Sequence, residues 1–304
     1  MIFLKLIRWP NLLMIALTQF LVRYCLIIPA FIVEYKVLDV FPDHLSKLQF
    51  LLLTASTVLI AAGGYIINDI HDTSIDQDNK PGKNKINNGI SESAALKYYY
   101  VLTSIGILAG FIVAFSIDKF SLGFVPLFAA ISLYMYSTFY KKRFLSGNIL
   151  IAALSALSVL IVGLFEPEFY KSIIYLLWYA VFAFEISLIR EIIKDIEDKD
   201  GDEKAQSKSL PILYGIKKTK VVVYGLILFM IATILHVLYN YFWNNTVISF
   251  WILSGIFLIP LLLLSYMIYI AEEKKDFHFA SIFTKVYMSL GIFSLLGFWY
   301  YFLR

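Results

Sequence analysis

Long apolar runs dominate this chain of 304 residues, and they restrict the folds that it can adopt. Each run approaches the about 20 residues that a helix needs to cross the hydrocarbon core of a bilayer. The composition agrees, because 60% of the residues are hydrophobic and 16% are charged, against about 45–50% and about 25% in soluble domains. We therefore expect an all-α fold, a polytopic helical bundle in a membrane.

We predict nine transmembrane helices, with eight or ten left open because some runs are short or adjacent. The predicted spans are residues 12–33, 48–68, 96–117, 121–140, 148–165, 170–190, 220–241, 248–270 and 280–302. We expect residues 1–304 to form a single domain, with Asp-rich loops near 68–90 and 194–215.

The Lys and Arg residues are distributed unevenly between the two predicted faces. Eighteen lie in segments on the side of the N-terminus, five lie on the opposite side, and three lie in or near spans. Cytoplasmic loops carry such an excess, so we expect the N-terminus and both Asp-rich loops in the cytoplasm of a bacterial or archaeal plasma membrane. The net charge of +4 then reflects topology and gives no argument for a nucleic-acid partner. The single cysteine, Cys25, excludes an internal disulfide and a cysteine-cluster metal site.

Two clusters of aspartates follow apolar runs, and their spacing is the same. Each contains a triplet with offsets of three and then four residues: Asp69, Asp72 and Asp76 in the first, and Asp195, Asp198 and Asp202 in the second. On a helix this spacing places the side chains on one face over two turns. Stacked like charges repel, and carboxylates near membrane depth cost still more, so a positive partner is needed.

A hard divalent cation is the partner that suits these clusters best. They offer oxygen ligands without a His/Cys set, which favours Mg²⁺ over Zn²⁺. Mg²⁺ typically takes one or two carboxylates and completes its shell with water and substrate phosphates. The clusters and the lysines beside them therefore predict a site for a diphosphate bridged by metal ions. Either cluster alone would also fit a solvated loop, but the repeated spacing on one predicted face argues against that interpretation.

The clusters resemble the two motifs of the UbiA family of intramembrane prenyltransferases. The segment NDIHDTSID at 68–76 resembles the family's NDxxDxxxD motif, and KDIEDKDGD at 194–202 resembles KDIEDxxGD, which contains DxxxD. Three weaker matches are RWPN at 8–11, YSTFYKKRFLSGN at 136–148 and the pair Lys208-Ser209. The resemblance covers nearly the whole chain.

The resemblance implies Mg²⁺-dependent transfer of an isoprenyl group from a polyprenyl diphosphate to a lipophilic acceptor in the membrane. It assigns the metal–diphosphate contacts to both clusters: Asn68, Asp72 and Asp76 in the first, Asp198 and Asp202 in the second, with Asp69 and Asp195 in support. It assigns substrate contacts to Asn11, Tyr136, Lys141 and Lys208. Lys83 or Lys85 would replace the Arg that many members carry after the first motif.

The acceptor and the oligomeric state stay open at the level of sequence. The first motif looks closest to the branches that prenylate geranylgeranylglyceryl phosphate or chlorophyll- and tocopherol-type aromatic acceptors, and the basic loops favour the phosphate. An ion-coupled transporter is the alternative of another class, although it predicts charges at mid-span rather than at helix ends. Arg23 and Glu185 are charged residues inside predicted spans, and their roles are not assigned.

Overall fold

The computed structural model describes residues 2–35, 45–73, 85–86, 89–166, 173–243 and 247–302, and these residues are almost entirely helical. The helices in chain order are α1 (Ile2–Leu6), α2 (Trp9–Leu21), α3 (Ile28–Tyr35), α4 (Lys47–His71), α6 (Glu92–Ser116), α7 (Phe124–Met135), α8 (Ser146–Phe165), α9 (Ile173–Glu197), α10 (Lys199–Lys204), α11 (Leu210–Leu238), α12 (Val247–Ile270) and α13 (Lys274–Phe302). Short π-helical turns, η1 (Val22–Ile27), η3 (Tyr136–Tyr140) and η5 (Tyr239–Trp243), and a 3₁₀ turn, η2 (Phe120–Gly123), join or extend them.

Nine helical segments within the described residues are long and apolar enough to cross a membrane. The predicted all-α membrane bundle is thereby confirmed. The two largest differences from the predicted boundaries are that α9 continues to Glu197 instead of ending at 190, and that α11 begins at Leu210 instead of 220. Helix α9 extends past its apolar run because backbone hydrogen bonds do not depend on side-chain polarity. The first residues of α11 form a separate helical turn, because the backbone is non-helical at Gly215 (φ 81°).

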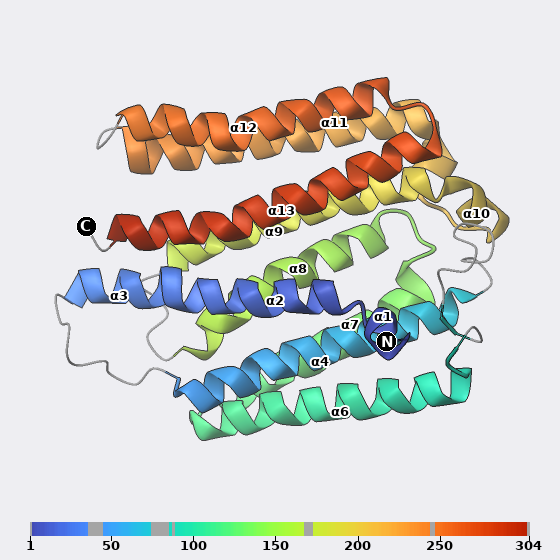
Figure 1. Ribbon diagram of the computed structural model, residues 1–304. Helices are drawn as coiled ribbons and strands as arrows, with labels where there is room; N and C mark the ends of the chain where they lie inside the picture. The colour runs from blue at the N-terminus through green and yellow to red at the C-terminus, as the bar shows by residue number, and fades with distance from the viewer. Residues whose placement is uncertain are drawn as a thin grey trace.

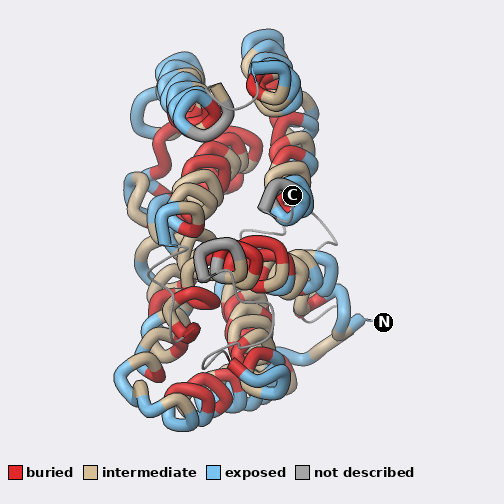
Figure 2. Tube along the Cα trace, turned by 90° about the vertical axis from the view of Figure 1, so that its left-hand side faces the viewer, coloured by how far each residue is buried: buried red, intermediate tan, exposed pale blue. Residues whose placement is uncertain are grey.

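The helices lie roughly along one direction, and the two Asp motifs meet at the same end of the bundle. Figure 1 shows α10 and the N-terminus at this end, which we call the motif end, while α3 and the C-terminus lie at the opposite end. Helix α9 is central, because it packs against α8, α11 and α13. Buried residues face the inside of the bundle and exposed ones face outward (Figure 2), as expected for helices whose outer faces meet lipid.

The opposite end of the bundle holds Arg23 in a buried ion pair. Its Nε donates to Oε1 of Glu166 at 2.8 Å, and its guanidinium also donates to the carbonyl of Leu45. The other oxygen of Glu166 accepts the N–H of Leu45 at 3.1 Å. The charge of Arg23 is thus compensated within the bundle, and it ties η1 to the end of α8. Glu185 accepts a hydrogen bond from Thr233 at 2.9 Å.

Candidate active site

A cavity of about 1120 Å³ extends inward from the motif end, lined mainly by α2, α4, α8, α9 and α13. Charged side chains from both Asp motifs line it near the helix ends. Farther along α9 and α13 the lining is apolar and aromatic and includes Tyr175, Trp178, Phe182, Ile292 and Leu295. A pocket with one charged end and one apolar end fits a ligand with a charged head and a hydrocarbon tail.

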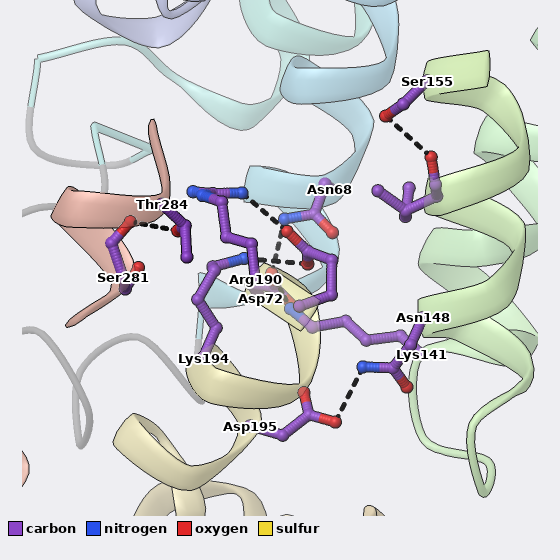
Figure 3. Close-up of polar contacts among 12 residues, drawn as sticks. Asn68, Asp72, Lys141, Asn148, Ser155, Arg190, Lys194, Asp195, Ser281 and Thr284 are labelled. Atoms are coloured by element: carbon purple, nitrogen blue, oxygen red, sulfur yellow. Dashed lines mark hydrogen bonds and ion pairs between the residues drawn. The ribbon is translucent and has the colours of Figure 1, made fainter. Parts of the chain in front are cut away.

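The first Asp cluster lies at the C-terminal end of α4, where helical geometry brings every fourth side chain together. The Asn68 side chain donates to Oδ2 of Asp72 at 2.6 Å, and Nζ of Lys141 forms an ion pair with the same oxygen (Figure 3). Asp72 is 4% exposed although it belongs to a charged motif. Its carboxylate therefore faces the cavity and a cation rather than bulk water.

The segment RWPN packs against this cluster. Arg8 donates to Asp69 at 2.6 Å, and its guanidinium carbon lies 4.9 Å from the centre of the Tyr65 ring. Burial, the largest single influence, would lower the pKa of the Arg8 guanidinium, but Asp69, Tyr65 and Asp72 together outweigh it and raise that pKa above its ordinary value. The Asn11 side chain donates to the Tyr65 hydroxyl at 3.2 Å. Arg8 and Asn11, the two ends of the segment, thus both contact residues of α4.

A π-helical turn presents Tyr136 and Lys141 to the cavity. The N–H of Lys141 bonds to the carbonyl of Tyr136 at 3.0 Å, which closes the wider turn at the end of η3. The start of α8 packs closely against this turn at Gly147. A Cβ there would lie 2.9 Å from the carbonyl oxygen of Tyr140 and 3.1 Å from the Tyr136 ring, so only glycine allows the approach.

The second Asp cluster lies at the C-terminal end of α9 and the start of α10. Asp195 accepts a hydrogen bond from the Asn148 amide of α8 at 2.9 Å (Figure 3). Asp198 occupies the N-cap position of α10 without a capping hydrogen bond from its side chain, and the N–H of Asp202 donates to its carbonyl at 3.1 Å. All three carboxylates line the cavity.

The two clusters share one space, with Tyr136 between them. The Tyr136 hydroxyl lies within electrostatic range of Asp72 from the first cluster and of Asp195 from the second. Residues of the two motifs are more than 100 positions apart in the chain. The fold therefore unites two groups of carboxylates that the sequence places in different loops.

Most of the residues assigned from sequence line the cavity. They are Asn11, Asn68, Asp69, Asp72, Tyr136, Lys141, Asp195, Asp198 and Asp202. Lys85, the alternative replacement for the family's Arg, lines it too. Lys208 is exposed and is not among the lining residues; its N–H donates to the carbonyl of Lys142 at 2.9 Å. Asp76 and Lys83 lie outside the described residues.

Sequence reasoning assigned no substrate or metal contact to four residues that the structure adds to the site, although it named Lys194 among the lysines that could offset the carboxylates. Asn148 holds Asp195, and Glu191 accepts from Arg190 at 2.7 Å and from Lys194 at 3.0 Å. Asn148 is the last residue of the segment at 136–148 that resembles the family, so this resemblance could have identified it as a site residue. The other three lie within or just after an apolar run, where a helical wheel alone does not say which face borders a cavity.

The donor set of the cavity fits a hard cation. The buried Oδ1 of Asn68 accepts no hydrogen bond from the described residues, and an amide oxygen beside carboxylates is a typical Mg²⁺ ligand. Within the described residues, no three His, Cys, Asp or Glu side chains form a complete metal-binding group. This agrees with Mg²⁺ chemistry, in which substrate phosphates and water supply much of the coordination shell.

Comparison with known proteins finds two relatives that share one name and a solved structure of similar fold. A digeranylgeranylglyceryl phosphate synthase of Methanosphaera stadtmanae is 34% identical over 248 residues, which are 80% of this chain and 86% of that protein. The synthase of the same name from Saccharolobus solfataricus is 38% identical over 176 residues, 57% of this chain and 60% of that protein. A solved UbiA homologue from Archaeoglobus fulgidus, bound to DMAPP and Mg²⁺, has a similar fold, with a TM-score of 0.57 at 17% identity over 98% of this chain and 99% of that one.

The family itself follows from a match over most of the chain. The model of the UbiA prenyltransferase family matches residues 26–301. This range includes both Asp motifs, the π-helical turn that carries Tyr136, and all the helices that line the cavity except α1 and α2. With nine apolar helices in the part of it that the structure describes, the chain is an integral multi-pass membrane protein that belongs to the UbiA prenyltransferase family.

Proposed function

We propose that this protein transfers a geranylgeranyl group from geranylgeranyl diphosphate to geranylgeranylglyceryl phosphate, an ether-lipid precursor in the membrane. The observation that carries the proposal is the single cavity with both Asp clusters at its charged end and an apolar remainder. The names of the two archaeal synthases support the acceptor. The DMAPP and Mg²⁺ bound by the Archaeoglobus homologue support a prenyl diphosphate donor and this metal.

The reaction that this site would serve breaks one C–O bond and forms another. The bond between the allylic carbon and the diphosphate oxygen breaks, and its electron pair leaves with the diphosphate. The free glycerol hydroxyl oxygen attacks the allylic carbon, forms the ether bond and gives up its proton. The apolar walls keep water from intercepting the electron-poor carbon.

The residues of the two clusters have distinct roles in this proposal. Mg²⁺ would be held by Asn68, Asp72, Asp195, Asp198 and Asp202, with Asp69 in support and Asp76 expected to join them. The metal supplies positive charge that stabilises the diphosphate as it leaves. Lys141 and Tyr136 would donate to diphosphate oxygens, and Asn11 would lie near the acceptor. Lys83 and Lys208 stay as candidates for outer contacts.

We also propose the orientation of the bundle. The excess of Lys and Arg on the side of the N-terminus favours a cytoplasmic motif end. Both soluble ligands, Mg²⁺ and the diphosphate that is released, would then exchange with the cytoplasm. The plasma membrane of an archaeon or a bacterium fits this arrangement.

A transfer assay with purified full-length protein tests the function. Radiolabelled geranylgeranyl diphosphate and Mg²⁺ are supplied with one acceptor at a time: geranylgeranylglyceryl phosphate, 4-hydroxybenzoate or homogentisate. We expect a labelled ether lipid only with the first acceptor, and no product after EDTA. The Asp72→Asn variant should lose at least about 100-fold in rate, as expected for a group that stabilises developing charge.

The control is Asp118→Asn, because Asp118 is exposed at the start of the loop before α7 and is not among the cavity-lining residues. This variant should keep the wild-type rate. Product with an aromatic acceptor instead would contradict the proposed acceptor. Transfer that survives EDTA would contradict the proposed role of the metal.

A further inference from the structure

Helices α9 and α13 face one another across the cavity in a fixed register. At the motif end, Nδ1 of His278 on α13 lies 2.9 Å from Oε1 of Glu197 on α9. The two helices are antiparallel. With distance from the motif end, residue numbers therefore decrease along α9 and increase along α13. Seven residues deeper on each, two turns or about 10 Å, are Arg190 and Lys285, and both line the cavity.

Cations outnumber carboxylates at this depth. Arg190 and Lys194 both donate to one carboxylate, that of Glu191, at 2.7 and 3.0 Å. Lys285 lies within electrostatic range of Arg190, Lys194, Arg8 and Glu191. Arg8 is paired with Asp69 and Lys194 also lies near Asp195, but Glu191 still has more cations around it than one carboxylate can neutralise. Figure 3 shows Arg190 and Lys194 between the α4 cluster and the face of α13 that carries Ser281 and Thr284.

Two of these cations have donor groups to spare. Nε of Arg190 is buried and has no hydrogen-bond partner among the described residues. Lys285 is exposed to the cavity, and its ammonium forms no hydrogen bond or ion pair in the described part of the chain. Like charges held together inside a membrane bundle are costly, and such charges usually mark a ligand site.

This group differs from the cations of the Asp motifs. Arg8 pairs with Asp69, and Lys141 pairs with Asp72, so each of those cations has a carboxylate of the first cluster as its partner. Among the described residues, Arg190 and Lys285 form no ion pair with a motif carboxylate, and they lie two turns deeper than the contact between Glu197 and His278. An anion other than the metal-bound diphosphate would satisfy them.

We propose that Arg190 and Lys285, assisted by Lys194, form a second anion subsite that binds the phosphate of the acceptor. The inference rests on the proposed function and deepens it, because it explains how the site selects a lipid phosphomonoester. Such a phosphate carries about −1.5 to −2 charge at neutral pH, so it can pair with both Arg190 and Lys285. A neutral acceptor of the same length would leave Lys285 without an anion and Arg190 with Glu191 alone.

Lys285→Met tests the subsite, since this side chain borders the cavity and supports no contact of the fold. In full-length protein, the KM for geranylgeranylglyceryl phosphate should rise at least about tenfold, as expected for a lost charge-assisted hydrogen bond. The KM for geranylgeranyl diphosphate should stay within about twofold. Lys285→Arg should restore most of the acceptor affinity, and Arg190→Met should act in the same direction.

Lys275→Met is the matched control, because Lys275 lies on the same helix in an exposed ion pair with Glu273 and should change neither KM. Binding of labelled geranylgeranylglyceryl phosphate without donor or Mg²⁺ provides a second readout. Weaker acceptor binding by Lys285→Met than by the wild type supports the subsite. This readout does not need catalysis, so it tests the subsite even if the wild type forms no product and the proposed function fails. An unchanged acceptor KM, equal acceptor binding, or a rise in the donor KM alone would overturn the subsite and leave the transfer activity standing.

Discussion

Asn148 is the residue that joins α8 to the second Asp motif. Its amide donates to Asp195 at 2.9 Å, so it orients a carboxylate that borders the cavity. Hydrogen bonds to charged groups contribute about 1.5–3 kcal/mol. We predict that Asn148→Ala raises the Mg²⁺ concentration needed for half-maximal transfer by about tenfold. Ile149→Ala on the same helix is the control, since Ile149 is exposed and is not among the cavity-lining residues.

The pair of Arg23 and Glu166 is a second residue-scale feature, at the opposite end of the molecule. Both side chains are almost fully buried. Removing one partner leaves an uncompensated buried charge and costs about 3–5 kcal/mol. We expect Arg23→Met to lower the thermal denaturation midpoint in detergent by several degrees, and the double variant with Glu166→Gln to recover part of the loss. Equal midpoints for the wild type and Arg23→Met would contradict a structural role for the pair.

Spacing along the chain was enough to predict which aspartates act together, because a helix places residues three and four apart on one face. It could not predict that Arg23 meets Glu166, since the two lie 143 positions apart and nothing local links them. The same reason explains why Arg190 was not assigned to the site, and why Lys194 was considered only as a neighbouring positive charge. Their importance depends on which face of α9 borders the cavity, and that is decided by packing.

At the scale of elements, glycines set how closely α4 and α6 approach. The Ser56 hydroxyl donates to the carbonyl of Gly106 at 2.6 Å. A Cβ at Gly106 would lie 2.8 Å from Cγ1 of Ile60 and 3.0 Å from the carbonyl oxygen of Ser56. We predict that Gly106→Ala lowers the denaturation midpoint, because overpacking costs about 1–3 kcal/mol. Gly225→Ala on α11 should cause no loss, since no atom lies within 4 Å of the added carbon.

The elements themselves were largely predictable, because apolar runs of membrane length form helices. Their ends were less so, since α9 and α11 continue through charged turns that a hydropathy pattern treats as loop. The π-helical turn at Tyr136–Tyr140 was not foreseen either. It depends on the way Gly147 and the start of α8 pack beneath it, which is a tertiary contact.

At the scale of the whole molecule, the account requires the motif end to face the cytoplasm. The span from η2 to η3 offers a direct test, because exposed Ser121 and Lys142 lie just inside one end and just beyond the other. In a Cys25→Ser background, we expect Lys142→Cys to react with an impermeant maleimide only after the membrane is opened. Ser121→Cys should react in intact cells. The reverse pattern would contradict the proposed orientation.

For the molecule as a whole, the sequence predicted the spans well and did not predict the cavity. The number of spans and the shared face of the two Asp motifs followed from hydropathy and from the distribution of Lys and Arg. The cavity did not, because its lining comes from α2, α4, α8, α9 and α13 together. No single segment carries that information.

The central claim is that the two Asp clusters form one metal–diphosphate site, and binding measures this most directly. We would titrate the full-length protein with geranylgeranyl thiolodiphosphate, a donor analogue that resists cleavage, with and without Mg²⁺. Asp72→Asn and Asp198→Asn should each abolish the Mg²⁺-dependent part of the affinity, and the double variant should be no weaker than either single one. Wild-type affinity in Asp198→Asn, with loss confined to Asp72→Asn, would contradict a shared site.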